Sequence, residues 1–336
     1  MTTSATGTEL EAGAWTPDHA PGEELPPGIG PYRLALRRLR RNYVALAFGA
    51  LFLVIVILCI LAPVYSHIAH MGPNDENVDQ ATNAVGLPIG PTWKLSHFFL
   101  GADSVGRDVA VRLLYGGRNS LIVGALATLI TIVLATVLGI LAGYFRGPID
   151  GLISRAFELI WAFPIYLLGI VLGLVLGLSG LDLGIVKIGG NSLLIPALII
   201  GVITTPYVGK PIRGQVLGLR EREFIDAARQ QGLSHVQIMF SEILPNVTST
   251  IIVFIPLVLA NAILTEAGLS YLGAGVRPPN PSWGNMIGDG IHLLPAAVHT
   301  MLVPGIMLTL CVLGINVFGD GVRDALDPRA KIRIEH

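Results

Sequence analysis

Residues 220–247 read REREFIDAARQQGLSHVQIMFSEILPNV and connect two long apolar runs. Four side chains of the first half recur at helical spacing and share one face: Phe224, Ala227, Ala228 and Gln231. The two adjacent alanines leave room for another surface to come close. We therefore expect a short helix that presents Phe224, Ala227 and Ala228 to a partner. The alternative is an amphipathic loop that rests on lipid.

The second half of this stretch predicts a turn followed by another helix. Gly232 suits the left-handed residue at which a helix ends, and Ser234 with Gln237 has the spacing of a capping box. Pro245 lies where the next apolar run begins. A new apolar stripe precedes it at Val236, Met239, Phe240 and Ile243. The sequence thus predicts an elbow of two short helices across the membrane surface.

The composition is that of a membrane protein. The chain contains 336 residues, of which 52% are hydrophobic and 13% are charged. A soluble domain usually carries about 25% charged residues, so a water-soluble enzyme is excluded. The net charge of −1 provides no electrostatic footprint for nucleic acid. Cys59 and Cys311 lie in apolar runs, so we expect two buried thiols and no disulfide framework.

Six stretches contain no Asp, Glu, Lys or Arg, and each exceeds the roughly 20 residues that cross a bilayer as a helix. They cover 42–74, 119–145, 159–181, 188–209, 243–265 and 290–319. A transmembrane β-barrel would instead show alternating segments of about 10 residues. We therefore predict an all-α polytopic membrane protein with six transmembrane helices.

Basic residues set the expected orientation in the membrane. With the N-terminus in the cytoplasm, sixteen Lys and Arg residues fall on the cytoplasmic side and six fall outside. Both termini are therefore expected in the cytoplasm. Residues 1–31 hold five prolines, five acidic residues and no Lys or Arg, a composition that predicts a disordered tail.

The elbow resembles a loop of bacterial ABC-importer permeases that is commonly written E-A-A-x3-G-x9-I-x-L-P. Here it reads DAARQQG at 226–232, with Asp226 in place of Glu, and its ending is contracted to ILP at 243–245. In that family the elbow is the coupling helix that docks into a groove of the ATP-hydrolysing subunit. The resemblance assigns ATPase coupling to Glu223, Phe224, Asp226, Ala227, Ala228, Arg229, Gly232, Leu244 and Pro245.

More narrowly, the chain resembles the C-type permease subunit of dipeptide and oligopeptide ABC importers, a group that includes nickel and glutathione permeases. The matching stretches are GADSVGRDVAVRLLYGGRNSL at 101–121, LAGYFRGPIDGLISRAFELIWAFP at 141–164, LTEAGLSYLGAGVRPPNPSWGNMI at 264–287 and FGDGVRDALDPR at 318–329. The first stretch begins with Gly-Ala-Asp at 101–103, where the family usually has Gly-Thr-Asp, so Ala102 replaces the threonine. The resemblance implies a type I ABC importer permease (MetI-like) fold in a bacterial or archaeal cell membrane.

The resemblance also implies partners and a function. The partners are a B-type permease subunit as heterodimer partner, two cytoplasmic ABC ATPase subunits that bind ATP and Mg, an external solute-binding protein and the lipid bilayer. This chain would hold no cofactor, no metal and no catalytic residue. It would move di- or oligopeptides, or a related small solute, by coupling ATP hydrolysis on partner subunits to alternating access.

Five segments are expected on this basis. They are a disordered cytoplasmic tail at 1–31, a basic segment with the first transmembrane helix at 32–64, an external segment at 65–117, the permease core at 118–320 with the coupling loop 211–245, and a cytoplasmic tail at 321–336.

Two further groups of residues are candidate sites. In the external string GADSVGRD at 101–108, unpaired charges beside the membrane would be costly, so we expect Asp103, Arg107 and Asp108 to pair with one another or with the partner permease. Around the fifth span, four residues are expected at the tunnel mouth or gate: Pro256, Asn261, Thr265 and Glu266. Glu266 would meet the amino terminus of a peptide there, or it would only mark a solvated span end.

Two other classes of function fit a polytopic protein: an ion-coupled secondary carrier or channel, and an intramembrane enzyme. Both are expected to place ionisable groups within spans, and the six charge-free runs offer none. The chain also lacks the phosphate-binding motif GxxxxGK[ST], so we expect no ATPase site on it.

Overall fold

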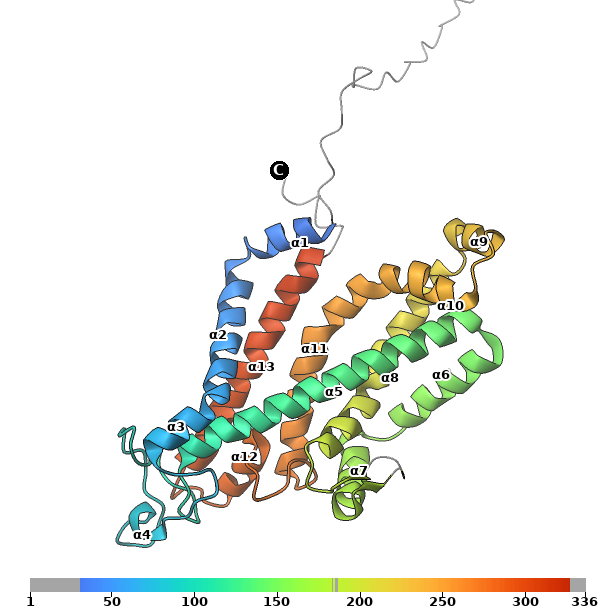
Figure 1. The fold of residues 1–336 in the computed structure, drawn as a ribbon. Helices are drawn as coiled ribbons and strands as arrows, with labels where there is room; N and C mark the ends of the chain where they lie inside the picture. Colours follow the sequence, from blue (N-terminus) through green and yellow to red (C-terminus); the bar gives the residue numbers. More distant parts are fainter. Residues whose placement is uncertain (1–30, 183, 185–186, 327–336) are drawn as a thin grey trace, which may run out of the picture.

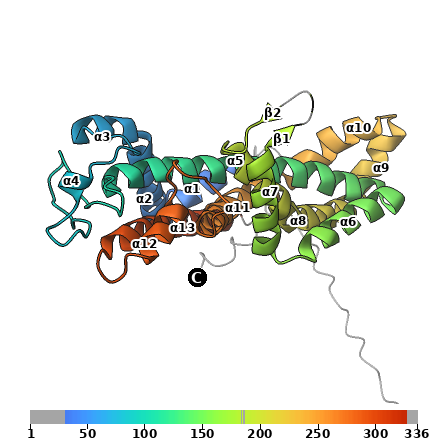
Figure 2. The ribbon, with the colours of Figure 1, turned by 90° about the horizontal axis from the view of Figure 1, so that it is seen from below.

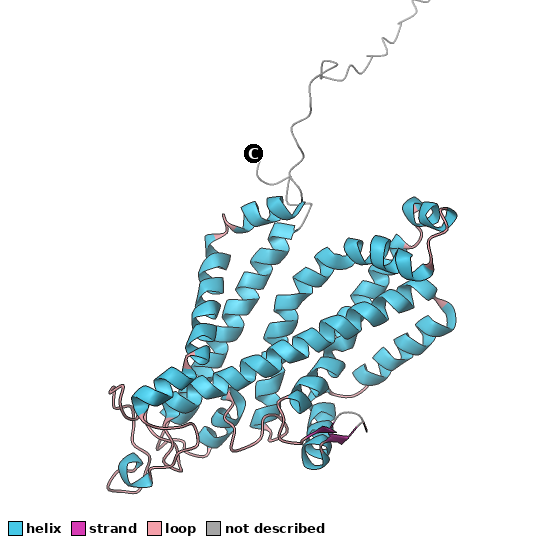
Figure 3. Cartoon of the chain, in the orientation of Figure 1, coloured by secondary structure: helices cyan, strands magenta, loops and turns pink. Residues whose placement is uncertain are grey.

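The computed structural model describes residues 31–182, 184 and 187–326, and helices dominate this part of the chain (Figure 3). The predicted tail at 1–31 lies outside the described residues except for Pro31, and so does 327–336. Of the predicted C-terminal segment 321–336, the described residues 321–326 form the end of α13 (His299–Leu326).

Five helices in the described part are long and apolar enough to cross a membrane, and a bent pair would supply a sixth crossing. The five are α2 (Tyr43–Ile60), α5 (Val109–Phe145), α8 (Leu194–Leu219), the run His235–Tyr271 and α13. The run His235–Tyr271 comprises α10 (His235–Gln237), the π-helical η1 (Ile238–Ile243) and α11 (Leu244–Tyr271). The predicted helical, polytopic class of fold is confirmed.

The third predicted span is not one straight helix. The charge-free run 159–181 contains the junction between α6 (Gly147–Trp161) and α7 (Ile165–Ser179), which meet at 90°. Pro164 precedes α7 and lacks the N–H that a continuous helix needs there. The charge-free criterion also missed most of α6, because this helix carries Asp150 and Glu158. A short antiparallel hairpin follows, in which Leu181 of β1 (Leu181–Asp182) lies opposite Ile188 of β2 (Lys187–Ile188).

The centre of the molecule is built by α5, α8 and α11. Helix α5 runs diagonally across the view in Figure 1 and packs against α8 along much of its length. A Cβ at Gly139 of α5 would lie 2.9 Å from the carbonyl oxygen of Gly209, and one at Gly143 would lie 2.7 Å from Val216. Small residues at such positions let helices in a membrane approach closely.

The first and last spanning helices, α2 and α13, lie side by side at one edge (Figure 1). Gly314 of α13 packs beside Phe52, and no side chain fits at Gly321 beside Ala45. The charge-free run 42–74 is broken, because α2 ends at Ile60 and α3 (Ala62–Ala69) begins after Leu61. Helix α1 (Pro31–Leu39) packs on α13.

The connections gather at two opposite ends of the bundle (Figures 1 and 2). One end carries α1, the α5–α6 turn and α9 (Glu223–Gln230). The other carries α3, α4 (Val78–Ala81), α7, the hairpin and α12 (Trp283–Ile291). The described basic segments that were predicted to share one side of the membrane therefore do lie at the same end of the molecule.

Candidate functional site

The predicted turn of the elbow is present. Gly232 has φ = +82°, its N–H donates to Arg229 O at 3.0 Å, and Leu233 N–H donates to Ala228 O at 3.2 Å. This pair of hydrogen bonds is a Schellman motif that ends α9. The capping box is also confirmed, since Ser234 N–H donates to Gln237 Oε1 at 2.8 Å and Gln237 N–H donates to Ser234 Oγ at 3.3 Å.

The second short helix is not separate from the membrane span. From His235 the chain is helical without interruption to Tyr271, a run of 37 residues. Pro245 is exposed and lies just after the π-helical η1, where its missing N–H interrupts the helical hydrogen bonds, and Leu244 is half-buried. The turn is therefore followed directly by the helical run that contains a membrane span.

The inward face of α9 differs from the predicted one. Ile225 and Ala228 are buried in a cluster with Ile238 and Ile243, whereas Phe224 is 39% exposed and Ala227 is exposed. The prediction that Ala228 shares an open face with Phe224 and Ala227 is therefore wrong. The predicted face left out Ile225. Ile225 lies three positions before Ala228 and shares its side of the helix, so burial of Ile225 also turns Ala228 inward.

The charged residues assigned to coupling surround the exposed part of α9. Glu223, Asp226 and Arg229 are all exposed. Arg229 Nη1 lies 2.9 Å from Asp226 Oδ1 on the same helix. An exposed pair of this kind contributes little stability, so these charges remain available to a partner surface.

Polar contacts hold the elbow to the ends of α5, α6 and α8. The hydroxyl of Tyr144 lies 2.8 Å from His235 Nδ1, and Arg220 Nη1 donates to Tyr144 O at 2.5 Å. Arg213 of α8 pairs with Asp150 of α6 at 2.5 Å. The turn is thus fixed to the bundle at its base, while Phe224 and Ala227 project outward.

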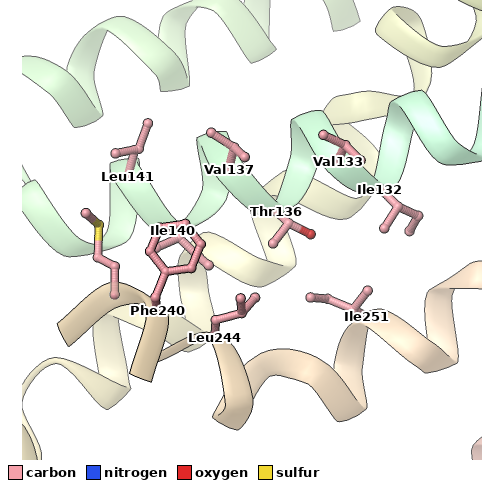
Figure 4. A pocket seen from close by; sticks show the side chains of 10 residues that line it. Ile132, Val133, Thr136, Val137, Ile140, Leu141, Phe240, Leu244 and Ile251 are labelled. Carbon is pink, nitrogen blue, oxygen red and sulfur yellow. The ribbon is translucent and has the colours of Figure 1, made fainter. Parts of the chain in front are cut away.

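An apolar hollow of about 380 Å³ lies between α5 and the base of the elbow (Figure 4). Phe240, Leu244 and Ile251 point from η1 and α11 toward the α5 residues Ile132, Thr136 and Ile140. Thr136 Oγ1 is buried and has no hydrogen-bond partner in the described part of the chain. Apart from Thr136, the residues that line this hollow are apolar.

In the external string 101–108, Asp103 and Arg107 form the predicted ion pair. Arg107 Nε lies 2.6 Å from Asp103 Oδ2, and Arg112 Nε lies 3.6 Å from the same oxygen. Arg107 also approaches Asp289 of α12 at 3.8 Å. The loop before α5 is thereby tied to the segment that precedes α13. Helix α5 begins at Val109, within the segment 65–117 that is expected outside the membrane.

Asp108 pairs with no arginine among the described residues and instead caps α5. Its carboxylate accepts from the backbone N–H groups of Phe98 at 2.7 Å, Ala110 at 2.8 Å and Val111 at 3.0 Å. The residue is fully buried. Burial raises the pKa of this carboxyl, and the three backbone donors act in the opposite direction. The string thus contains one ion pair and one helix cap.

Glu266 does not lie at an open tunnel mouth, and that prediction is wrong for this chain. The side chain is 0% exposed within α11, and its Oε1 accepts from Ser270 Oγ at 2.6 Å. Ser120 of α5 and Ser282, the cap of α12, lie beside the same carboxyl. The sequence placed it at a span end, but the segment before α12 folds back over this part of α11 and covers it.

The cluster around Glu266 fastens α12 to the bundle. Trp283 N–H donates to Ser120 Oγ at 3.3 Å, and the fully buried Trp283 ring donates through Nε1 to Leu113 O at 3.1 Å. We expect Glu266→Leu to lose about 1–3 kcal/mol of stability, since it leaves the buried hydroxyl of Ser270 without its acceptor. We expect Glu266→Gln to stay near wild type because an amide can replace these contacts. Thermal unfolding of the purified protein measures both, and a Glu266→Leu variant as stable as wild type would contradict this role.

The other predicted gate residues do not share one surface. Pro256 is half-buried and packs against Gly319 of α13. Thr265 is buried and donates to Asn261 O at 2.8 Å, while Asn261 itself is exposed. Of these three residues, Asn261 alone faces an open surface, so they do not form a joint gate within this chain.

The described part of the chain is thus a bundle of apolar helices from which the elbow projects with an open outer face. The chain belongs to the family described as "Binding-protein-dependent transport system inner membrane component", whose model matches residues 135–332. A second model, "N-terminal TM domain of oligopeptide transport permease C", matches residues 30–84. Family members work with ATPase subunits and a solute-binding protein, and this chain is a multi-pass membrane protein.

Individual relatives sharpen this placement. The dipeptide transport system permease protein of Alkalihalophilus pseudofirmus is 37% identical over 315 residues, which cover 94% of this chain and 95% of the relative. A glutathione transport system permease protein of Pectobacterium atrosepticum is 34% identical over 302 residues, with 90% and 92% covered. The inward-facing methionine ABC transporter MetNI shares the fold, with a TM-score of 0.50 and 17% identity over 64% of this chain and 96% of that one.

Proposed function

We propose that this chain is the C-type permease subunit of an importer for di- or oligopeptides, or for a related small solute such as glutathione. It pairs with a B-type permease, and two separate ATPase subunits bind ATP and Mg. The end that carries α1 and α9 faces the cytoplasm, as the distribution of basic residues favours. The dipeptide, glutathione and peptide permeases among its relatives support this substrate class.

The observation that carries the proposal is the open face of α9. Phe224 and Ala227 are exposed on a helix that projects from the bundle, although an isolated aromatic side chain gains from burial. The turn behind them leads without a break into α11. An ATPase subunit that grips this face would therefore act directly on a membrane helix.

At the opposite end, the external segments 65–117 and 268–298 would receive the solute-binding protein. They are joined by the contact between Arg107 and Asp289, so they can respond to one docking event together. The relatives named above are transport system permease proteins, and they give no support to the alternative of a secondary carrier or channel.

The proposal is tested by reconstitution. The permease pair, the ATPase subunits and the binding protein in proteoliposomes should take up a labelled dipeptide only when ATP is present on the α9 side. Uptake that depends on an ion gradient and ignores ATP would overturn the proposal in favour of a secondary carrier.

We expect Ala227→Arg to reduce ATP-driven uptake to less than about a tenth of wild type, because a bulky cation would separate Phe224 from the docked subunit. The exposed position means that folding is unaffected. Ala227→Ser is the matched control, since it keeps the small volume, and it should retain most of the activity. Copurification of the ATPase subunits measures docking, and wild-type recovery with Ala227→Arg would locate the coupling surface elsewhere.

A further inference from the structure

One residue near the end of α5 contacts both ends of the elbow. Tyr144 is the last but one residue of α5 and is buried. Its carbonyl oxygen accepts a hydrogen bond from Arg220 Nη1 at 2.5 Å, just past the end of α8. Its hydroxyl lies 2.8 Å from Nδ1 of His235, the first residue of α10. All of α9 lies between Arg220 and His235, so Tyr144 holds the chain before and after that helix.

The contact between Tyr144 and His235 combines a hydrogen bond with ring packing. The two rings meet edge-on with their centroids 5.6 Å apart, and the His235 ring also lies 5.8 Å from the ring of Phe145. A buried phenol needs a polar partner, and within the described residues His235 alone partners this hydroxyl. Phenylalanine at either position would therefore remove the hydrogen bond and keep a ring in place.

The elbow has a second link to the same end of α5, but it lies at the surface. Arg146, the residue after α5, forms an ion pair with Glu221, and both side chains are exposed. An exposed pair of this kind contributes little. Tyr144 instead belongs to the buried cluster that contains Ile225 and Ala228 of α9. A movement of Tyr144 would thus reach α9 through this cluster as well as through the two hydrogen bonds.

Helix α5 runs from the external end of the molecule to the elbow (Figure 1). Its 37 residues extend over about 55 Å. Helices α8 and α11 contain internal prolines, which interrupt helical hydrogen bonds, whereas α5 contains none. In its first turn the buried Arg112 donates through Nη1 to Pro73 O at 2.9 Å. Of the helices that reach from the external end to the elbow, α5 is therefore the least able to absorb a displacement by bending.

We propose that Tyr144 is a positioning residue that makes the elbow follow α5, so that docking of a solute-binding protein on the external segments reaches the ATPase subunits. Because Tyr144 holds the chain on both sides of α9, a shift of α5 moves the two ends of that helix together. Phe224 and Ala227 then act on the docked ATPase subunit as one surface. The inference rests on the proposed function, and it adds the residue that couples the two docking surfaces.

The test is a double-mutant cycle in the complete complex, reconstituted in proteoliposomes. ATP hydrolysis is measured with and without a saturating amount of solute-binding protein loaded with the dipeptide Ala-Ala. We expect Tyr144→Phe to reduce the stimulation by the binding protein about fivefold, within the usual range of coupling between two sites. Unstimulated hydrolysis and copurification of the ATPase subunits should stay at wild-type levels, because the turn at Gly232 and the buried Ile225 still build α9.

The second variant of the cycle is His235→Phe, which should give the same loss of stimulation. The double variant should lose no more than either single variant, because all three lack the same hydrogen bond. Tyr43→Phe is the matched control. It removes a hydroxyl from an exposed tyrosine at the start of α2, at the same end of the molecule, and should behave as wild type.

The outcomes separate the inference from the proposed function. Wild-type stimulation in both single variants would overturn the inference. Losses that add in the double variant would also overturn it, since the two residues would then act separately. A Tyr144→Phe protein that no longer copurifies with the ATPase subunits would do the same, because the hydroxyl would then maintain the docking surface itself. Failure of the wild-type complex to import Ala-Ala with ATP would instead overturn the proposed function, and the inference with it.

Discussion

Replacement of Gly232 by valine is expected to reduce ATP-driven uptake to less than about a tenth of wild type. Gly232 has φ = +82°, a conformation that a β-branched residue adopts only with strain of about 1–3 kcal/mol. The strain is relieved if the last turn of α9 unwinds, and this loses the hydrogen bond from Leu233 to Ala228. Phe224 and Ala227 would then no longer be aimed at the ATPase subunit. Uptake and copurification of the ATPase subunits measure the effect.

The control for this variant is Gly232→Asn, because asparagine tolerates the left-handed conformation better than other side chains. A Cβ at this position meets nothing within 4 Å, so the two variants differ by conformational strain and not by a clash. We expect Gly232→Asn to keep more than about half of the uptake. Equal activity of the valine and asparagine variants would show that the turn does not aim α9.

Replacement of Asp108 by alanine is expected to destabilise the protein by about 2–4 kcal/mol, the largest stability effect at the external end. The change leaves the N–H groups of Phe98, Ala110 and Val111 without their acceptor in a fully buried position. Each buried donor without a partner costs about 1–3 kcal/mol before relaxation. The recovery of monodisperse protein and its thermal unfolding midpoint measure the loss.

Asp108→Asn should recover more than half of that loss, because asparagine is as good a helix cap as aspartate and still offers one acceptor oxygen. Asp79→Ala at an exposed position on α4 is the matched control and should stay within about 0.5 kcal/mol of wild type. An Asp108→Ala protein as stable as this control would show that water satisfies the three amides.

Features that depend on short-range chemistry were predictable from the sequence. The left-handed turn at Gly232 and the capping box of Ser234 require only residues three to five positions apart. The long spans were predictable for a similar reason, since exclusion of charge from hydrocarbon leaves a continuous apolar run. The pair of Asp103 and Arg107 was predictable from the cost of unpaired charges beside the membrane, and a tight turn brings the two residues together, since Asp103 N–H donates to Arg107 O at 3.0 Å.

Features that depend on distant parts of the chain were not predictable in this way. Ile225 turns Ala228 inward only because Ile238 and Ile243 return to meet it. Glu266 is buried only because the segment before α12 covers it, and no local pattern around the residue indicates this. The bend between α6 and α7 falls at Pro164, but a proline inside an apolar run can also remain within a helix, as Pro256 does in α11.

The pairing of α2 with α13 has a consequence for how the protein is made. Ile60 ends α2 and His299 begins α13, so 238 residues separate the two helices in the order of synthesis. At translation rates of 5–20 residues per second, roughly 12–48 s pass before the partner of α2 leaves the ribosome. During that interval α13, whose Gly314 packs beside Phe52, is missing. The Phe52 side of α2 therefore lies against lipid or an insertion factor. Until then α2 can pack only on earlier helices such as α5, so its contact with α13 is among the last of the described fold to form during synthesis.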